Sequence, residues 1–224
     1  TMNPVGYLHN TRQGLVGERG IGYDYLLAAN GLFLRASNPL LSATIQVAPA
    51  EVRGLAPLAE SLELTHGRIH FDPMVETPLK LLDQMGHEWL GHELYLAVVW
   101  QEGQYLTVIP EQTGTPASVQ YQRPRNVLLD VHTHGKMSAF FSGTDDRDEQ
   151  GLQLYMVVGR LDQLVKQVAL RIGVYGYFAP LDWNEVFDRP PPPWLDVVSA
   201  RPNLTENPAS THTDPSWPDM DNRR

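Results

Sequence analysis

The sequence predicts an α/β (α+β) fold, in which a mixed β-sheet is flanked by helices and preceded by a small β-rich N-terminal region. Short runs rich in β-branched and aromatic residues recur along the chain and are separated by Gly, Pro and Asn, as in strands joined by turns. One longer segment, residues 73–92, carries apolar residues at the spacing of an amphipathic helix. A second helix start, at Ser142, follows a buried strand.

Size and charge narrow the possible functions. The 224 residues suffice for one domain of ordinary size and a smaller appendage. The 26 acidic residues outnumber the 17 basic ones, and a net charge of −9 argues against a general nucleic-acid binder. No run approaches the roughly 18 apolar residues of a membrane span. The first residues also lack a charged-then-apolar signal pattern, so we expect a soluble, cytoplasmic protein without a membrane partner.

Residues 1–72 are expected to form the β-rich region. Asn30-Gly31 is a strong hairpin signal and lies between the apolar runs 23–29 and 32–36. Residues 42–47 and 61–65 have the composition of further strands. No chemically suggestive motif occurs in this region, and a role in recognition is one hypothesis for it.

Residues 73–188 are expected to form the main domain, beginning with the helix of residues 73–92. Within this helix, His87, Glu88 and His92 superficially match the zinc motif His-Glu-x-x-His. The two histidines are five residues apart, however, and are therefore rotated by about 140° from each other on a helix. They do not share a face. Strands are expected at residues 94–100, 105–109, 118–122, 127–131, 152–159 and 168–178.

The most informative stretch is residues 126–150. A β-branched run ends in His132-Thr133-His134, and alternation along a strand places both imidazoles on one face, roughly 6.5 Å apart at the backbone. Ser142 is a good helix N-cap, and acidic residues fill the first turns after it. The loop between strand and helix would bring Asp145 toward both histidines. The alternative is two strand histidines beside an ordinary capping box.

Two imidazoles, one carboxylate and a water are the usual ligands of a catalytic zinc ion, whereas structural zinc sites are normally closed by four protein ligands, often thiolates. The chain contains no cysteine. This also excludes the zinc deaminases, whose second metal element is Pro-Cys-x-x-Cys. The composition therefore favours a catalytic Zn²⁺ held by His132, His134 and Asp145.

The spacing His132-x-His134, seven residues, Ser142, two residues, Asp145 resembles the JAMM signature of the JAB/MPN metalloprotease family. The resemblance covers roughly residues 75–188. It implies a JAB/MPN cytidine-deaminase-like fold and a zinc isopeptidase that cuts after the C-terminal glycine of a ubiquitin-like protein. The implied partner is that protein or its conjugate.

The same family places a catalytic glutamate between the first helix and the first strand. Glu93 occupies that place; Glu88 competes, and Glu102 is a third option. Glu93 would act as general base, and Ser142 would donate a hydrogen bond to the oxyanion of the tetrahedral intermediate. Two departures from the family pattern are Gly135, where proline is usual, and the absence of the cysteine and glycine that usually follow the glutamate.

A narrower resemblance is carried by residues 31–36, 52–58, 138–146 and 174–178, which are similar to the protein A family of the bacterial PRTRC cassette. Other members of that cassette resemble ParB and a ThiF-type activating enzyme, so the resemblance implies such an enzyme as a further partner. Two other functions are open: a non-catalytic MPN-type scaffold, and hydrolysis of a small amide or thiocarboxylate.

The final segment, residues 189–224, is rich in proline, has mixed charge and shows little periodicity. Four consecutive prolines, Pro190 to Pro193, favour polyproline II. The remainder has too little apolar surface to order itself alone, and we expect a largely disordered tail.

Overall fold

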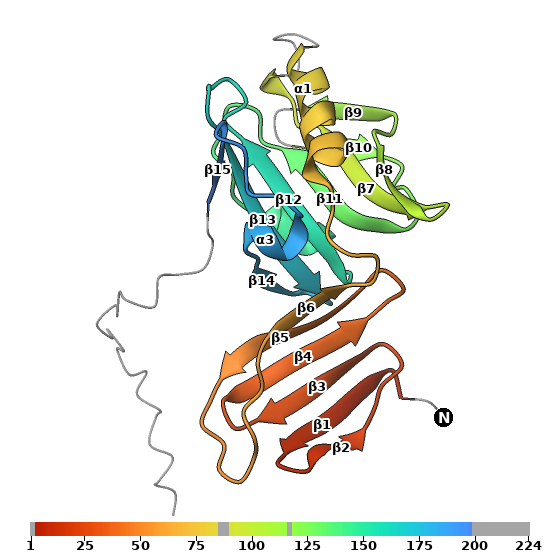
Figure 1. Cartoon of the computed structure of the whole chain (residues 1–224), viewed down its shortest axis with the longest axis vertical. Helices are drawn as coiled ribbons and strands as arrows, with labels where there is room; N and C mark the ends of the chain where they lie inside the picture. The colour runs from red at the N-terminus through yellow and green to blue at the C-terminus, as the bar shows by residue number, and fades with distance from the viewer. Residues whose placement is uncertain (1–2, 85–89, 116–117, 199–224) are drawn as a thin grey trace, which may run out of the picture.

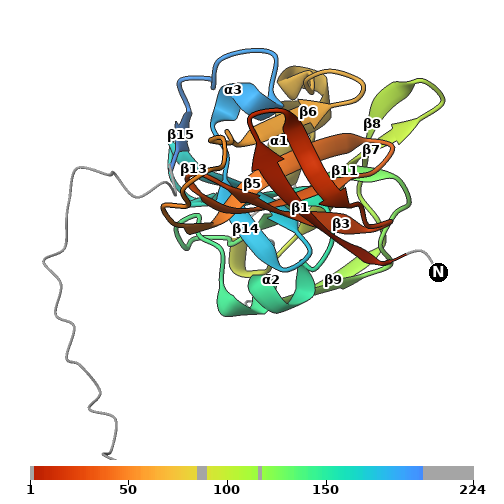
Figure 2. The ribbon, with the colours of Figure 1, turned by 90° about the horizontal axis from the view of Figure 1, so that it is seen from below.

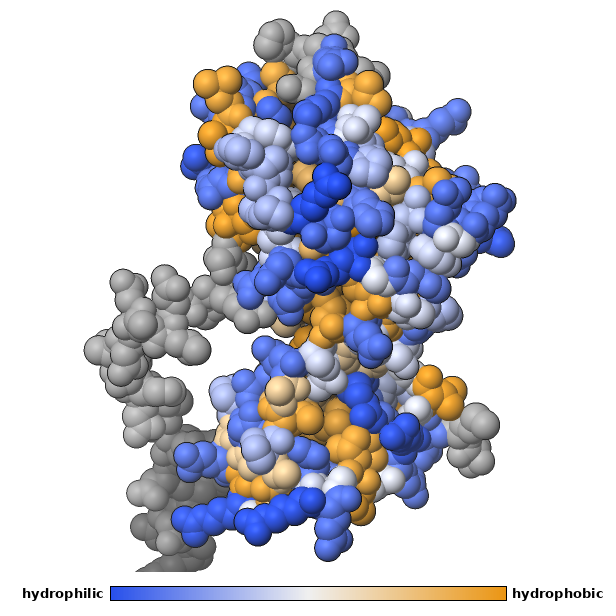
Figure 3. Space-filling model, in the orientation of Figure 1, coloured by the Kyte–Doolittle hydropathy of each residue, from blue (hydrophilic) through white to orange (hydrophobic). Residues whose placement is uncertain are grey.

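The computed structural model describes residues 3–84, 90–115 and 118–198. Two lobes lie one above the other in Figure 1, each built on a β-sheet, and the chain passes from one to the other in the segment after β6. Figure 2 views the molecule from the side of the N-terminal lobe. Figure 3 shows a mostly hydrophilic surface on the visible face, with hydrophobic residues gathered over the lower lobe.

The N-terminal lobe is a six-stranded sheet in the order β2-β1-β3-β4-β5-β6. Strands β1 and β3 are parallel, and the other neighbours are antiparallel. The β3–β4 hairpin turns at Asn30-Gly31, where Gly31 has a φ of 143° and a Cβ would lie 2.3 Å from the carbonyl oxygen of Ala48. The strands are β1 Val5–Thr11, β2 Gly14–Glu18, β3 Tyr23–Ala28, β4 Gly31–Ser37, β5 Leu41–Pro49 and β6 Ser61–Leu64.

The second lobe contains a seven-stranded sheet in the order β14-β13-β12-β11-β7-β8, with β15 pairing to β13. Only β11 with β12 and β13 with β15 are parallel pairs. A separate hairpin, β9–β10, lies beside this sheet. The strands are β7 Tyr95–Gln101, β8 Gln104–Val108, β9 Gln112–Thr115, β10 Ser118–Tyr121, β11 Val127–Thr133, β12 Gln153–Gly159, β13 Lys166–Val174, β14 Tyr177–Pro180 and β15 Leu195–Val197.

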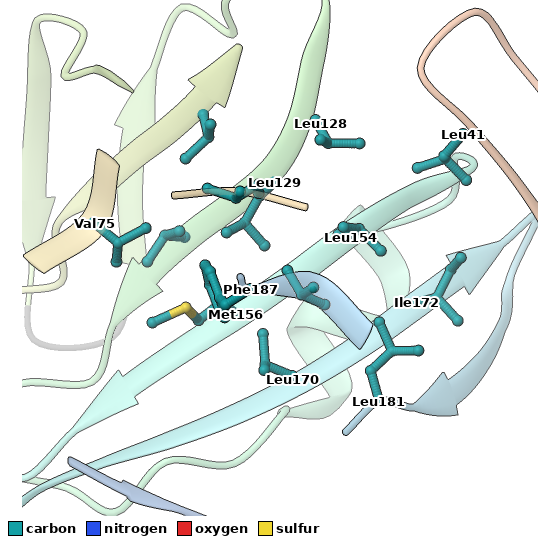
Figure 4. Close-up of a cluster of buried hydrophobic side chains, with 14 of the residues drawn as sticks. Leu41, Val75, Leu128, Leu129, Leu154, Met156, Leu170, Ile172, Leu181 and Phe187 are labelled. Atoms are coloured by element: carbon teal, nitrogen blue, oxygen red, sulfur yellow. The ribbon is translucent and has the colours of Figure 1, made fainter. Parts of the chain in front are cut away.

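The main hydrophobic core is shared by both lobes. Leu34, Leu41 and Ile45 of the N-terminal sheet belong to the same buried cluster as the apolar face of the second sheet. Figure 4 shows how side chains from β5, β11, β12 and β13 meet in this cluster with Val75 and Phe187. The opposite face of the N-terminal sheet has its own small core, formed by Leu8, Leu26, Ala28 and Phe33.

Side-chain alternation gives the second sheet one face that packs into the shared core and another that carries polar residues beside two smaller apolar clusters. Leu129 and Val131 of β11 point into the shared core, whereas Asp130 and His132 lie on the other face. The register places Asp130 opposite Tyr155 of β12 and His132 opposite Tyr95 of β7. This polar face carries the candidate site.

The described residues contain less helix than the sequence predicted. Residues 73–92 were expected to form one helix. The structure is continuously helical up to Gln84, beginning as the π-helix η1 Asp72–Glu76 and continuing as α1 Thr77–Gln84, whereas residues 90–92 are not α-helical. Pro78 has no N–H to donate to the carbonyl of Met74, and the Thr107 hydroxyl donates to that carbonyl instead. Residues 85–89, including His87 and Glu88, lie outside the described residues. The other helices are α2 Gly143–Asp148 and α3 Trp183–Val186, so "flanked by helices" is only partly right.

The described chain continues in regular structure beyond residue 188. Within the segment assigned to the tail, β15 pairs with β13, and Leu195 is buried in the shared core. The indole nitrogen of Trp183 also donates to the carbonyl of Arg189 at 2.6 Å. Residues 199–224 lie outside the described residues. No helix within the described ranges is long and apolar enough to cross a membrane.

Candidate metal centre

Two histidines at the end of β11 form the centre of the site. His132 lies on the strand, and the backbone N–H of His134 continues the parallel ladder by donating to the carbonyl of Val158 at 2.8 Å. Both side chains are buried, at 8% and 5% exposure. Their Nε2 atoms are 3.3 Å apart, so the two rings face one point, as strand alternation predicts.

A capping box fixes Asp145 beside these rings. Ser142 is the N-cap of α2, and its hydroxyl oxygen accepts hydrogen bonds from the backbone N–H groups of Thr144 at 3.2 Å and Asp145 at 3.3 Å. In return, Oδ2 of Asp145 accepts from the Ser142 backbone N–H at 2.5 Å. With Oδ2 held in this way, Oδ1 lies 3.3 Å from Nε2 of His132.

The three side chains fit a tetrahedral metal ion. Their ligand atoms all lie within 4.8 Å of one another. Two ligands about 2.05 Å from a tetrahedral zinc ion lie about 3.3–3.4 Å apart. The distances of 3.3 Å from Nε2 of His132 to Nε2 of His134 and to Oδ1 of Asp145 match two edges of such a tetrahedron. The structure therefore brings together the predicted ligand set.

Burial keeps both imidazoles neutral, as metal binding requires. Removal from water lowers the pKa of His132 to about 4; the Asp145 carboxylate opposes this effect, and His134 and Arg171 add to it. Burial likewise lowers the pKa of His134, again against the influence of Asp145. Nδ1 of His134 is buried without a hydrogen-bond partner among the described residues, although the Ser138 backbone lies near enough to raise the pKa of the ring.

Glu93 lies at the same cavity as the metal ligands. Its backbone N–H donates to the carbonyl of Thr115 in β9 at 2.8 Å. The backbone N–H of the next residue, Leu94, donates to the hydroxyl of Thr133 at 3.0 Å, and the backbone N–H of Thr133 donates to the Leu94 carbonyl at 2.9 Å. Thr133 stands between the two histidines. Burial, and then the nearby Asp145 carboxylate, raises the pKa of Glu93 to about 7. A half-buried carboxyl with such a pKa beside a metal site is suited to proton transfer.

The alternatives to Glu93 are placed differently. Glu88 lies outside the described residues. Glu102 is exposed in the turn between β7 and β8, at the end of β7 away from Glu93, and does not line the cavity. Ser142 does line it, and because its oxygen acts as the acceptor in the cap, its own hydrogen is not used there.

The cavity itself has a volume of about 170 Å³ and extends from the ligands along the polar face of the sheet. Sequence reasoning missed much of its lining. Asp130 could have been found by strand alternation, since it precedes His132 by two residues on the same face. The remaining unpredicted residues come from other strands and loops; they include Tyr95, Tyr121, Arg123, Glu149 and Tyr155.

Arg171 of β13 holds α2 against the sheet. It donates to Oε2 of Glu149 from Nε at 2.9 Å and from Nη2 at 2.6 Å, and to Oδ1 of Asp146 from Nη1 at 2.6 Å. Its guanidinium carbon lies 3.9 Å and 3.8 Å from the ring centres of Phe141 and Phe178. Burial raises the pKa of Glu149, and Arg171 opposes that rise. Because Asp145 is in the first turn of the same helix, Arg171 also positions a metal ligand.

The loop between β11 and α2 lies close to neighbouring backbone at two glycines. Gly135 has a φ of 54°, and a Cβ there would lie 2.6 Å from the carbonyl oxygen of Leu90. At Gly159 of β12, a Cβ would lie 2.4 Å from the carbonyl oxygen of Met137 in this loop. The absence of side chains at both positions lets the loop lie on the sheet and return toward the histidines.

Comparison with known families agrees with this geometry. Residues 70–172 match the family model described as prokaryotic homologs of the JAB domain. The match supports a JAB-domain family for this part of the chain, and it spans Glu93, His132, His134, Ser142 and Asp145. No curated protein matches the sequence.

Proposed function

We propose that the protein is a zinc-dependent hydrolase of the JAMM type, which cleaves a peptide or isopeptide bond after the C-terminal glycine of a ubiquitin-like protein. The observation that carries this proposal is the convergence of two buried, neutral imidazoles and a capped carboxylate on one point. The match to prokaryotic homologs of the JAB domain supports it. A ubiquitin-like protein or its conjugate would be the substrate, and a ThiF-type activating enzyme would act in the same pathway.

In the proposed mechanism, His132, His134 and Asp145 hold the zinc ion. When bound, zinc supplies Lewis-acid polarisation of the scissile carbonyl and activates water for attack. Glu93 takes the proton of the attacking water and delivers it to the leaving nitrogen, which a carboxyl with a pKa of about 7 can do in both directions. The Ser142 hydroxyl, whose hydrogen the helix cap does not use, donates to the developing oxyanion.

JAB-domain families include inactive members as well as metalloisopeptidases, so a non-catalytic scaffold is the competing function. A scaffold would need neither the buried ligand set nor a carboxyl group of raised pKa at the same cavity. The presence of both favours catalysis.

Metal analysis of the purified full chain, followed by a cleavage assay, tests the proposal. We expect about one zinc ion per chain in the unmodified protein, and loss of zinc in His134→Ala. His70→Ala is the matched control, because His70 is exposed and pairs with Asp188 away from the site. Full zinc retention in His134→Ala would contradict the proposed site.

The cleavage substrate is a ubiquitin-like protein, ending in glycine, that is fused to a short C-terminal peptide. Glu93→Gln should retain zinc and lose activity by a factor on the order of 10²–10⁴. If the zinc-loaded wild-type chain binds this substrate and leaves it intact, or if Glu93→Gln cleaves as fast as wild type, the catalytic proposal is wrong.

A further inference from the structure

The cavity of the metal centre has a second polar region that the proposed chemistry does not use. Asp130 precedes His132 by two residues on the same face of β11, which puts the two backbone positions roughly 6.5 Å apart. We call this region the tyrosine arm and define it by the cavity-lining residues Tyr95, Tyr121, Arg123, Asp130 and Tyr155.

The tyrosine arm contains buried hydroxyl groups with incomplete hydrogen bonding. Tyr95 and Tyr155 are each 1% exposed, and neither hydroxyl makes a hydrogen bond of good geometry with a described residue. The Tyr95 hydroxyl nevertheless lies near enough to Asp130, and the Tyr155 hydroxyl near enough to Arg123, to change the pKa of those groups. Both residues line the cavity; Tyr155 of β12 lies opposite Asp130, and Tyr95 of β7 lies opposite His132. A buried hydroxyl group without a hydrogen-bond partner destabilises the folded state by about 1–3 kcal/mol, unless a ligand or a water molecule supplies the missing hydrogen bond.

The Asp130 carboxylate also has unused capacity. It accepts from the side-chain amide of Gln153 at 3.3 Å and from the Arg123 guanidinium at 3.5 Å, the long limit of a hydrogen bond, and both contacts use Oδ2. Arg123 makes its closer contact with the side-chain oxygen of Gln153. Oδ1 of Asp130 takes part in neither contact with Arg123 or Gln153.

The charges around the cavity favour a cationic occupant. Five carboxyl groups line the cavity, whereas Arg123 is its single cationic lining residue among the described part of the chain. Glu149 is paired with Arg171, and Asp145 offsets one of the two charges of a bound zinc ion. The attraction for a cation in the tyrosine arm therefore comes from Asp130, the carboxyl group that belongs to the arm itself.

We propose that the tyrosine arm is a specificity subsite for the primary ammonium group of a lysine-length side chain next to the scissile bond. This proposal rests on the function proposed above. An ammonium group has three donors, and Oδ1 of Asp130 and the hydroxyl oxygens of Tyr95 and Tyr155, which accept no hydrogen bond of good geometry from a described residue, supply three acceptors.

The dimensions agree with such a side chain. A lysine spans roughly 6 Å from Cα to Nζ, comparable with the distance along β11 from His132 to Asp130. The volume of about 170 Å³ belongs to the whole cavity, which the tyrosine arm shares with the metal centre, and the lysine side chain adds five heavy atoms beyond Cα. The rings of Tyr95 and Tyr121 stack with centroids 3.5 Å apart and offer an apolar wall for the methylene groups.

Calorimetric titration of the zinc-loaded full chain with N-acetyl-lysinamide and N-acetyl-norleucinamide tests the subsite without requiring turnover. The two probes differ in the terminal ammonium. We expect the lysine probe to bind at least tenfold more tightly. Asp130→Asn, which keeps the shape and an acceptor for Gln153, should bring the ratio of the two dissociation constants close to one. Tyr155→Phe should reduce the preference for the lysine probe over the norleucine probe several-fold.

Two further variants separate recognition from a structural effect. Arg123→Gln removes a competing cation and should increase the preference for the lysine probe, the opposite sign to Asp130→Asn. Glu51→Gln, an exposed acid in the N-terminal lobe, makes the same charge change as Asp130→Asn and should leave the ratio unchanged. All variants must retain zinc and the wild-type circular dichroism spectrum.

Equal binding of both probes by wild type would overturn the subsite, as would an unchanged ratio in folded Asp130→Asn. Tighter binding of N-acetyl-glutamic acid amide than of the lysine probe would also overturn it. If the chain binds the lysine probe more tightly than the norleucine probe but never cleaves the glycine-ended fusion, the proposed hydrolase function is wrong and the subsite stands. The two failures are therefore distinguishable.

Discussion

The contacts of Arg171 predict a large loss of stability when this residue is replaced by methionine. Its side chain is 8% exposed, and its partner Glu149 is 11% exposed. Removing one partner of a buried ion pair costs about 3–5 kcal/mol, because the other charge is left uncompensated. The contact with Asp146, which is 51% exposed, adds little. Methionine retains part of the packing between Phe141 and Phe178, so we expect a loss of about 3–5 kcal/mol from the pair itself.

Urea denaturation of the zinc-free protein, followed by circular dichroism, measures this loss. The double variant Arg171→Met with Glu149→Gln carries no unpaired buried charge and should regain about half of it. A second readout is zinc affinity, which should fall about 10- to 100-fold in Arg171→Met, because α2 carries Asp145. A loss below 1 kcal/mol, or a double variant less stable than Arg171→Met, would refute the buried-pair argument.

Three other predictions follow from local geometry. Gly135→Ala should lower the unfolding free energy by about 2–3 kcal/mol in thermal denaturation, since a positive φ costs about 1–2 kcal/mol and the new Cβ also meets the Leu90 carbonyl. Gly103→Ala is the control, because Gly103 has a positive φ but open space around it, so this variant carries the backbone cost without the steric clash. Equal losses in the two variants would contradict the clash at Gly135. Ser142→Gly should lower the unfolding free energy by only a few tenths of a kcal/mol, because glycine is also a tolerated N-cap. It should lower kcat on the glycine-ended fusion by on the order of 10²-fold. An unchanged kcat would refute the proposed role of Ser142 as oxyanion donor. In chelator-treated protein, stability should fall from pH 6.5 to 8.5, because burial raises the pKa of Asp130 and of Glu93 to about 7 and that of Glu149 to about 8, so the folded state binds extra protons below those values. The Asp130 share is about 1 kcal/mol, so Asp130→Asn should reduce the fall by that amount in pH-dependent urea titrations, and a wild-type stability that rises over the same range would reverse the sign of the argument.

The convergence of the three candidate metal ligands could be predicted from the sequence because their geometry is local. Alternation along one strand puts His132 and His134 on one face, and a capping box places Asp145 three residues after Ser142. These rules need only a few neighbouring residues. Glu93 was harder, since it depends on how the chain enters β7; the structure places it at the cavity through contacts with Thr115 and Thr133.

Other features depend on pairing between distant segments, which spacing along the chain does not reveal. Tyr155 lies opposite Asp130 because β11 and β12 are parallel in a particular register. Arg171 reaches α2 from a strand more than twenty residues later. The helix predicted at residues 73–92 is present up to Gln84, but its first part is π-helical. There Pro78 has no N–H to donate, and the Met74 carbonyl accepts from the Thr107 hydroxyl instead.

The shared interior of the two lobes limits how the protein can be divided. Leu41 and Ile45 are enclosed by side chains from the sheet that carries the candidate metal ligands, and the Asn38 amide donates to the carbonyl of Leu152 at 3.1 Å. A fragment beginning at residue 73 would therefore expose the apolar surface that these residues cover, and would lose solubility along with part of its packing. The N-terminal lobe is thus a structural part of the sheet beneath the candidate site, and a partner that binds this lobe also contacts the support of that site.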